Sequence, residues 1–457
     1  MNRSNRIIES FPKNEASLSG VFFTRAFFAV GGCIVLLFIL AFFLPVLMSV
    51  ARYALLLMLV LVSADYIALF IAGKAPRALR KLMDRMSNGD ENRVELLIEN
   101  RLPFSVYIKV VDELPVQCQH RSWLRNVFLK GNSQQSVVYQ LQPFERGVYS
   151  FGQILMYTSS RLGLLIRQSV SLAEKDVEVF PSFVQLRKYE LLSQTSIQQE
   201  TGSKRMRKIG HSMEFEQIKE YVRGDDVRTI NWKATARRGA LMINNYTDEK
   251  SQQVYCLIDK GRLMKMPFNQ LSLLDYAINA TLVLSNVCLQ RQDRVGLMTF
   301  SNKMDSLLAA DRKPTQQASI LQVLYNQTTQ YQETDFEMLY LQVRSRIKQR
   351  SLLVLFTNFE SLSGLKRQIP YLRSISKHHL LMVVFFENTE LTSITETPAK
   401  NLEDVYRKTI AAKFAHEKRL IVKELRSHGI LSVLTAPEHL TVNAINKYLE
   451  LKARQAS

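Results

Sequence analysis

The stretch QQVYCLID, from Gln252 to Asp259, opens a series of apolar segments that decides the fold class of the C-terminal half. The later members are DRVGLMTFS, SLLVLFTN, LLMVVFFE and ILSVLTAP, which begin at residues 293, 351, 380 and 430. Amphipathic stretches typical of helices separate them. Strands that are apolar throughout are covered on both faces of a sheet. The pattern therefore predicts an α/β fold over residues 251–457, a doubly wound parallel sheet with helices on both sides.

Ligands of such sheets gather at the carboxyl ends of the strands. Any ligand-binding residues are therefore expected in the loops that follow Ile258, Phe300, Phe356 and Phe386. No Walker-type G-x-x-x-x-G-K-S/T motif and no G-x-G-x-x-G motif follows any of these strands, and the chain has no G-x-S-x-G elbow. We expect neither a nucleotide cofactor nor a serine-hydrolase centre.

The charge balance narrows the kinds of partner. The 457 residues include 60 Lys and Arg against 41 Asp and Glu, a net charge of +19. Such an excess fits contact with nucleic acid, anionic lipid or an acidic protein surface. The basic run from Lys204 to Lys208 lacks the interleaved aromatic side chains of a base-stacking surface, so we do not expect nucleic acid. The four cysteines are scattered without zinc-type spacing, which indicates a reducing compartment.

The N-terminal region predicts a membrane anchor. No charged residue occurs from Ala26 to Met48, a span that crosses a hydrocarbon core of about 30 Å as a helix. A second apolar segment runs from Tyr53 to Ala72 and is broken only by Asp65. Residues 26–73 therefore predict a transmembrane helical hairpin, preceded by a cytoplasmic segment at 1–25. Basic residues flank both spans, so the positive-inside rule predicts an inner-membrane protein whose termini and soluble domains are cytoplasmic.

Asp65 calls for two interpretations, because an ionisable group in a span is a candidate functional site. It lies near the cytosolic end of its helix, and no second acid within the spans could form a proton relay with it. We expect it to reach interfacial water, Arg52 or Lys74. Transport is the less favoured alternative.

A different pattern follows the spans. Residues 74–88 form a basic stretch that we expect to be a linker. Segments such as RVELLIEN and SVYIKVVDEL then alternate apolar and polar residues over residues 89–183. Short alternating strands without helical periodicity predict a small β-sandwich.

The strand that ends in Asp259, with the two apolar strands after it, resembles a von Willebrand factor A domain. The resemblance implies a Mg²⁺ loop with a D-x-S-x-S motif, a distant Thr and a later Asp. Gly261 and Leu263 stand where the two serines would be, and Asn358 follows Thr357 where the later Asp would stand. We therefore expect no metal, with loop amides or Arg262 satisfying Asp259. A working metal site is the alternative.

The segment from His211 to Lys250, HSMEFEQIKEYVRGDDVRTINWKATARRGALMINNYTDEK, is similar to the signature of the bacterial domain of unknown function 58 family. The matching positions are Glu214, Phe215, Tyr221, Gly224, Asp225, Asp226, Arg228, Trp232, Lys233, Ala236, Arg237 and Leu241. Members of that family often carry a membrane hairpin, a β-rich segment and a von Willebrand factor A-like domain. The family is associated with MoxR-type AAA+ ATPases, which implies a protein partner of that class.

The signature also has a physical interpretation. Gly224 permits a tight turn, Asp225 or Asp226 can cap a helix, and Gly239 can end it. We expect Trp232 and Tyr221 to pack this helix into a joint between the two soluble domains, within a segment at 184–250. The alternative is a partner-binding surface whose charges are listed here: Asp226, Arg228, Lys233, Arg237 and Arg238.

The sequence favours a non-enzymatic, membrane-anchored scaffold or adaptor that binds protein partners, acting with a MoxR-type AAA+ ATPase in the assembly or maturation of protein complexes. One alternative is a metal-assisted hydrolase that uses Asp225, Asp226 and Asp259. The other is a nucleic-acid-binding or anion-binding protein, suggested by the net charge.

Overall fold

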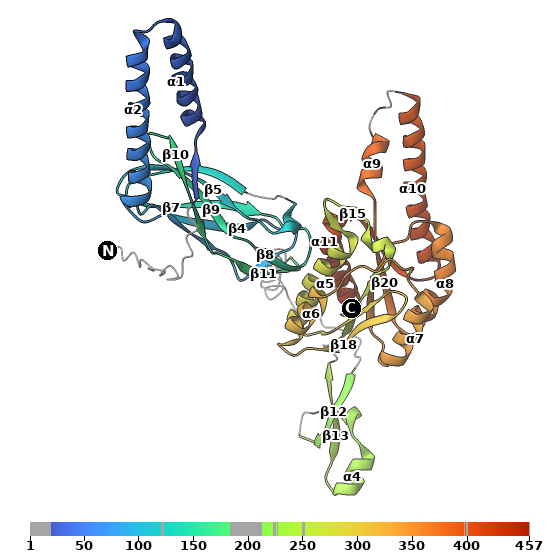
Figure 1. The fold of residues 1–457 in the computed structure, drawn as a ribbon. Coiled ribbons are helices and arrows are strands. Elements are labelled where there is room, and N and C mark those ends of the chain that lie inside the picture. The colour runs from blue at the N-terminus through green and yellow to red at the C-terminus, as the bar shows by residue number, and fades with distance from the viewer. Residues whose placement is uncertain are drawn as a thin grey trace. The chain divides into compact units, whose positions relative to one another are not determined.

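The computed structural model describes residues 20–119, 123–182, 213–222, 225, 227–248, 252–396, 398 and 401–456. The chain divides into two compact units, Met1–Phe180 and Pro181–Ser457. Figure 1 shows two long helices and a β-rich region in the first unit, and a mixed α/β arrangement in the second.

The first unit contains two helices that are long and apolar enough to cross a membrane. Helix α1 spans Arg25–Phe43, and α2 spans Leu47–Tyr66 and continues as a π-helical turn, η1, at Ile67–Ile71. The turn between them lies at residues 44–46, so residues 49–52, which separate the two predicted apolar segments, belong to α2. Pro45 explains the difference, because proline restricts the residue before it and donates no backbone N–H to a continuing helix.

Asp65 does not reach Arg52, Lys74 or interfacial water as expected. Its side chain is fully buried and accepts hydrogen bonds from the backbone N–H groups of Leu164, at 3.1 Å, and Leu165, at 2.9 Å. The hydroxyl of Ser160 donates a further bond to the same carboxyl group. Asp65 therefore ties the end of α2 to the β-rich region.

A strand precedes the first long helix. β1, Gly20–Phe23, pairs antiparallel with β10, Leu165–Ser171. The segment expected only as a cytoplasmic N-terminal stretch thus contributes an edge strand to the β-rich region.

Three sheets make up that region. Their orders are β1-β10-β9-β5-β6, β2-β4-β7 and β3-β11-β8. The remaining strands are β2 Arg77–Lys81, β3 Arg85–Ser87, β4 Asn92–Glu99, β5 Val106–Asp112, β6 Trp123–Leu129, β7 Gln134–Leu141, β8 Gly147–Phe151, β9 Ile154–Ser159 and β11 Lys175–Phe180. Their buried apolar side chains form one core. Residues 74–88, expected as a linker, therefore contain β2 and β3.

Arg80 explains why this basic stretch folds into the sheet. Its guanidinium is buried against the carboxylate of Asp112, to which Tyr139 also donates a hydrogen bond of 2.6 Å. The Arg80 guanidinium also donates to the carbonyl oxygens of Ala173, at 2.7 Å, and Gly152, at 3.0 Å. A buried charge needs such a complete set of partners, so Arg80 belongs to the core.

In the second unit, a hairpin of β12, Met213–Glu220, and β13, Met242–Asp248, carries a short helix between its strands. This helix, α4, spans Trp232–Arg238 and follows a 3₁₀ turn at Val227–Thr229. We call residues 221–241 the hairpin tip.

The main sheet has the order β18-β17-β14-β19-β20-β21. Its strands are β14 Gln253–Asp259, β17 Arg294–Phe300, β18 Met304–Asp311, β19 Leu352–Phe356, β20 Leu380–Phe386 and β21 Leu431–Thr435. Five of them are parallel and match the predicted apolar segments. β18 runs antiparallel to β17, so the sheet is mixed and not purely parallel as expected. β18 lies at the edge and alternates half-buried with exposed residues, so it lacks the continuous apolar run of the other strands.

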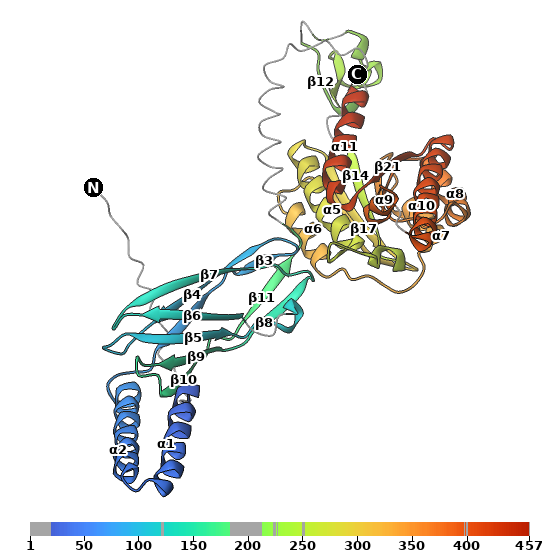
Figure 2. The same cartoon turned by 90° about the horizontal axis from the view of Figure 1, so that it is seen from above.

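Helices cover both faces of this sheet (Figure 2). One buried core joins the sheet to α5 Leu273–Gln290, α6 Gln316–Tyr325 and α11 Leu440–Ala456. The core on the other face joins it to α7 Phe336–Arg346, α8 Leu362–Ser376 and α10 Leu402–Ser427. Helix α9, Thr389–Glu396, packs beside α10. A small ribbon of β15, Pro267–Phe268, and β16, Leu271–Ser272, precedes α5.

Candidate functional site

Asp259 lies at the carboxyl end of β14, in the central part of the sheet, and is only 2% exposed. One carboxylate oxygen accepts bonds from the Thr334 hydroxyl, at 2.6 Å, and the Gly261 amide, at 2.8 Å. The other accepts a 2.6 Å bond from the hydroxyl of Thr357. Sequence reasoning missed Thr334, because it follows no strand and directly precedes Asp335, the N-cap of α7.

The charge of Asp259 is disfavoured by its surroundings. Burial raises the pKa of this carboxyl group, and the bonds from Thr334, Thr357 and Gly261 lower it only in part. Arg262, suggested by the sequence as a partner, instead forms an ion pair of 3.2 Å with Glu333. Asp259 therefore depends on hydroxyl and amide donors.

The donors around Asp259 do not fit the Mg²⁺ loop that the resemblance implies. A Cβ added at Gly261 would lie 2.0 Å from the Thr334 hydroxyl oxygen, so that hydroxyl fills the place of a serine side chain. The side-chain oxygen of Asn358 accepts a 2.7 Å bond from the ammonium of Lys418. Leu263 supplies no oxygen. An ammonium so close to the expected ligand position opposes a cation, and Mg²⁺ needs a near-octahedral set of oxygens.

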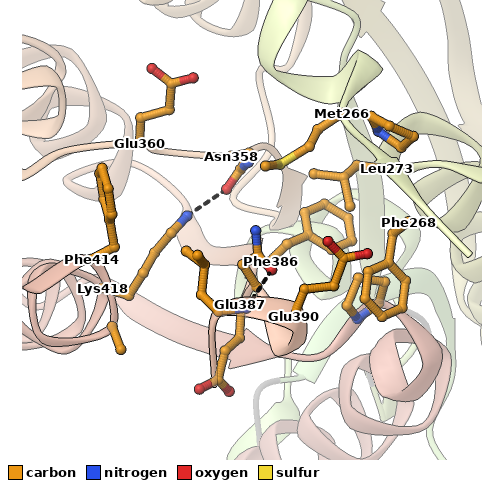
Figure 3. A pocket seen from close by; sticks show the side chains of 15 residues that line it. Met266, Phe268, Leu273, Asn358, Glu360, Phe386, Glu387, Glu390, Phe414 and Lys418 are labelled. Carbon is orange, nitrogen blue, oxygen red and sulfur yellow. Dashed lines mark hydrogen bonds between the residues drawn. The ribbon is translucent and has the colours of Figure 1, made fainter. Parts of the chain in front are cut away.

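Asn358 also lines an apolar pocket of about 480 Å³ at this edge of the sheet. Figure 3 shows Phe414 and Lys418 of α10 on one side, and Met266, Phe268 and Leu273 on the other. The pocket thus lies in the loop region after β19 and β20, where any ligand-binding residues were expected from the sequence.

Lys418 contributes a buried ammonium group to this pocket. Its ammonium donates to the Asn358 side chain, at 2.7 Å (Figure 3), and to the carbonyl oxygen of Phe359, at 2.5 Å. Burial lowers its pKa to about 8, and the negative charges of Glu360 and Glu387 limit that fall. No sequence signal separates Lys418 from the other basic residues of α10.

The signature residues lie in the hairpin. Asp225 accepts a 3.0 Å bond from the Val222 amide and pairs with Lys219 at 3.2 Å. The same amide and Lys219 lower the pKa of the Asp225 carboxyl group. It closes a turn and does not cap α4 as expected. Gly224 and Asp226 lie outside the described residues, and Glu214 and Phe215 are described only as part of β12.

Asn231 caps α4 instead, accepting a 3.0 Å bond from the Ala234 amide, and Gly239 ends the helix in a left-handed conformation with φ of 72°. Thr235 faces the hairpin, because its hydroxyl accepts a 3.0 Å bond from the Met242 amide. Trp232, the first residue of α4, is 71% exposed. Trp232 is therefore not packed into the hairpin, and its expected place in a joint between the two soluble domains stays a prediction.

Other apolar side chains of the hairpin tip are exposed as well. They are Val222 at 65%, Val227 at 62% and Leu241 at 45%. Exposed basic side chains share the tip: Arg228, Lys233, Arg237 and Arg238. Tyr221, also in the signature, is half-buried, and its amide donates a 2.8 Å bond to the Leu241 carbonyl oxygen. The tip therefore combines a tryptophan, aliphatic side chains and positive charge on one accessible element.

Comparisons with known proteins find similarity without an assigned activity. A protein of Bacillus subtilis (strain 168) described as "Uncharacterized protein YeaD" is 25% identical over 178 residues. That match covers 38% of this chain and 44% of the relative, so the chain spans less than half of the relative's length.

Two solved structures show weak similarity. The conserved hypothetical protein BatB from Bacteroides thetaiotaomicron is 15% identical, with 45% of this chain and 100% of that chain covered and a TM-score of 0.30. The CARDB domain of the PF1109 protein from Pyrococcus furiosus is 14% identical, with 24% and 96% covered and a TM-score of 0.17. A family model described as "Protein of unknown function DUF58" matches residues 217–404 of the chain.

Proposed function

We propose that this protein is a membrane-anchored scaffold or adaptor that binds a protein partner, and that a MoxR-type AAA+ ATPase is that partner. The two long apolar helices support an anchor. The ATPase is proposed because residues 211–250 are similar to the signature of a family associated with such enzymes. The function so proposed is the assembly or maturation of protein complexes at a membrane.

The observation that carries the proposal is the exposure of the hairpin tip. Trp232 is 71% exposed in an element that also presents Arg237 and Arg238 to solvent. Tryptophan and arginine are the residues most enriched at binding hot spots, and large exposed apolar side chains mark interaction surfaces. The positive charge favours an acidic surface on the partner.

We propose a non-enzymatic role, which three features support. Burial raises the pKa of Cys256 to about 12 and that of Cys288 well above its ordinary value, so neither thiol is a ready nucleophile. Asp225 is held by a backbone amide and a lysine, and Asp259 by two hydroxyls and an amide. These contacts do not support a role for either acid in a pair of carboxylates that catalyses hydrolysis.

We also propose that the α/β part of the second unit is von Willebrand factor A-like. Its five parallel strands, the position of Asp259 at the end of β14 and the nearby Thr334 and Thr357 support that assignment. On this proposal the metal loop has been replaced by a hydroxyl network, and partner binding does not need a divalent ion.

The test measures the affinity of the full-length protein in nanodiscs for a purified MoxR-type ATPase from the same cell. We expect Trp232→Ala to weaken binding by about tenfold or more, equivalent to about 1.4 kcal/mol. Because the ring is exposed, the free energy of unfolding should change by only about 0.5 kcal/mol or less. Tyr331→Ala, which removes another aromatic ring, 75% exposed, is the matched control and should leave the affinity unchanged.

Unchanged affinity in the Trp232 variant would remove the hairpin tip as the binding surface. A fall of several kcal/mol in the free energy of unfolding would instead indicate that Trp232 is buried in a joint. Absence of any complex between the wild-type protein and the ATPase would reject the proposed partner.

A further inference from the structure

A row of exposed apolar side chains follows one broad side of α10. Leu402, Tyr406, Ile410 and Phe414 recur at every fourth residue and are 86%, 70%, 40% and 46% exposed. At 1.5 Å per residue the row extends over about 18 Å. Exposed apolar residues at this spacing are typical of surfaces that contact an amphipathic helix. We call these four residues the α10 row.

The α10 row is continuous with the apolar pocket, because Phe414 belongs to both. Phe414 and Lys418 form one wall (Figure 3), and Leu391 and Glu390 of α9 contribute to the lining. The pocket volume of about 480 Å³ lies in the range of ligand pockets and is ample for one or two large apolar side chains. The row and the pocket together make one extended apolar surface.

The charge around the pocket has the opposite sign to that of the chain. Glu360, Glu387 and Glu390 line it against a single lysine, although the chain carries a net charge of +19. Glu360 and Glu390 are exposed. Three carboxylates against one ammonium make the lining negative on balance, so it favours a positively charged ligand.

We propose that the pocket and the α10 row bind a basic amphipathic helix of a partner protein, with apolar side chains at every fourth position and lysine or arginine beside them. An apolar side chain of that helix fills the pocket, and its basic side chains pair with Glu360 and Glu390. A small molecule would need only the pocket. The length of the α10 row therefore favours a helix as the ligand. This site goes beyond the hairpin tip and does not depend on it.

The test uses two fluorescein-labelled helical peptides. In one, leucine recurs at every fourth position with lysine and alanine between; in the other, glutamate replaces each lysine. Fluorescence anisotropy measures their binding to the full-length protein in phosphatidylcholine nanodiscs, with empty discs as the blank for lipid binding. We expect the lysine peptide to bind about tenfold or more tightly than the glutamate peptide.

Two variants and one control localise the binding. Phe414→Ser removes the side chain shared by the pocket and the row, and Glu360→Gln combined with Glu390→Gln removes two exposed charges at unchanged size. Each should lower the affinity for the lysine peptide by about tenfold or more. The Trp232→Ala variant should bind this peptide with wild-type affinity. Leu341→Ser, at a 55% exposed leucine of α7, is the matched control and should have no effect.

Equal binding of the two peptides would overturn the proposal, as would no binding above that of empty discs or full binding by both pocket variants. A fourth contradicting outcome is a change from dimer to monomer in Phe414→Ser, measured by analytical ultracentrifugation, with peptide affinity unchanged. That result would show that a second copy of the chain occupies the surface. Because Trp232→Ala is tested separately, failure here leaves the proposed adaptor function to its own experiment.

Discussion

Lys418 illustrates how a single side chain couples stability to pH. Its pKa falls from an ordinary 10.5 to about 8 because the ammonium is buried. The folded state therefore binds this proton less tightly than the unfolded state, and holding the charge costs stability below pH 8. The cost, at most about 3 kcal/mol, disappears as the pH rises from 8 through 10.5.

Comparison with Lys418→Met tests this coupling. Between pH 7 and pH 10, the free energy of unfolding of the wild type should rise relative to that of the variant, by up to about 3 kcal/mol. Lys413→Met is the matched control, because Lys413 is an exposed lysine of the same helix, and its difference from wild type should stay constant. A constant difference for Lys418→Met as well would show that the ammonium pays no burial penalty.

The sequence could not identify the partners of several single residues, and the reason is distance along the chain. Asp65 binds backbone groups at residues 164 and 165, and Arg80 binds Asp112 and Ala173. Local pattern reveals the polarity of such residues but not the fold that brings their partners to them. Thr334 and Lys418 were missed for the same reason, since their roles depend on Asp259 and Asn358 in other loops.

Helix α4 is the element whose formation is most easily tested. Its seven residues are too few to be stable as an isolated helix, so its N-cap matters. Asn231→Ala removes the acceptor for the Ala234 amide and the 2.8 Å bond to Asn244, which should cost about 1 kcal/mol. We expect faster hydrogen exchange at the amides of Ala234 to Arg238.

Asn231→Ser should retain most of the protection, because serine also caps helices. Equal exchange rates in the alanine variant and the wild type would mean that contacts with the hairpin, and not the cap, hold α4 in place.

At the level of elements, the predictions succeeded where the burial of an element is uniform. β14, β17, β19 and β20 are buried on both faces, so their sequences are almost entirely apolar and matched the prediction. β21 was also predicted, although it lies at the edge of the sheet and is mostly half-buried. β18, β2 and β3 have mixed burial or charged residues and were not predicted. The helix within the signature was predicted to begin after a cap at Asp225 or Asp226, whereas Asn231 is the cap.

The membrane arrangement is the testable property of the first unit as a whole. β1 precedes α1 and pairs with β10, which follows α2, so a spanning hairpin must return both flanks to one side of the membrane. With Cys33 replaced by alanine, a cysteine at Val46 should react with an impermeant thiol reagent in intact cells, because Val46 is 84% exposed in the turn. A cysteine at Val116, 92% exposed in the β-rich region, should react only after lysis.

Labelling of Val116→Cys in intact cells would place the β-rich region outside and contradict the predicted orientation. Protection of both positions would contradict a hairpin that crosses the membrane.

The pairing of β1 with β10 also constrains the order of events during synthesis. Thr24 donates a hydrogen bond to the carbonyl oxygen of Gly163, a residue 139 positions later. At about 5–20 residues per second, β1 leaves the ribosome roughly 7–28 s before its partner strand exists. Its backbone groups stay without their sheet partner while both long helices are made. Completion of the sheet is therefore a late step, which joins the two ends of the helical pair only after both helices have been synthesised.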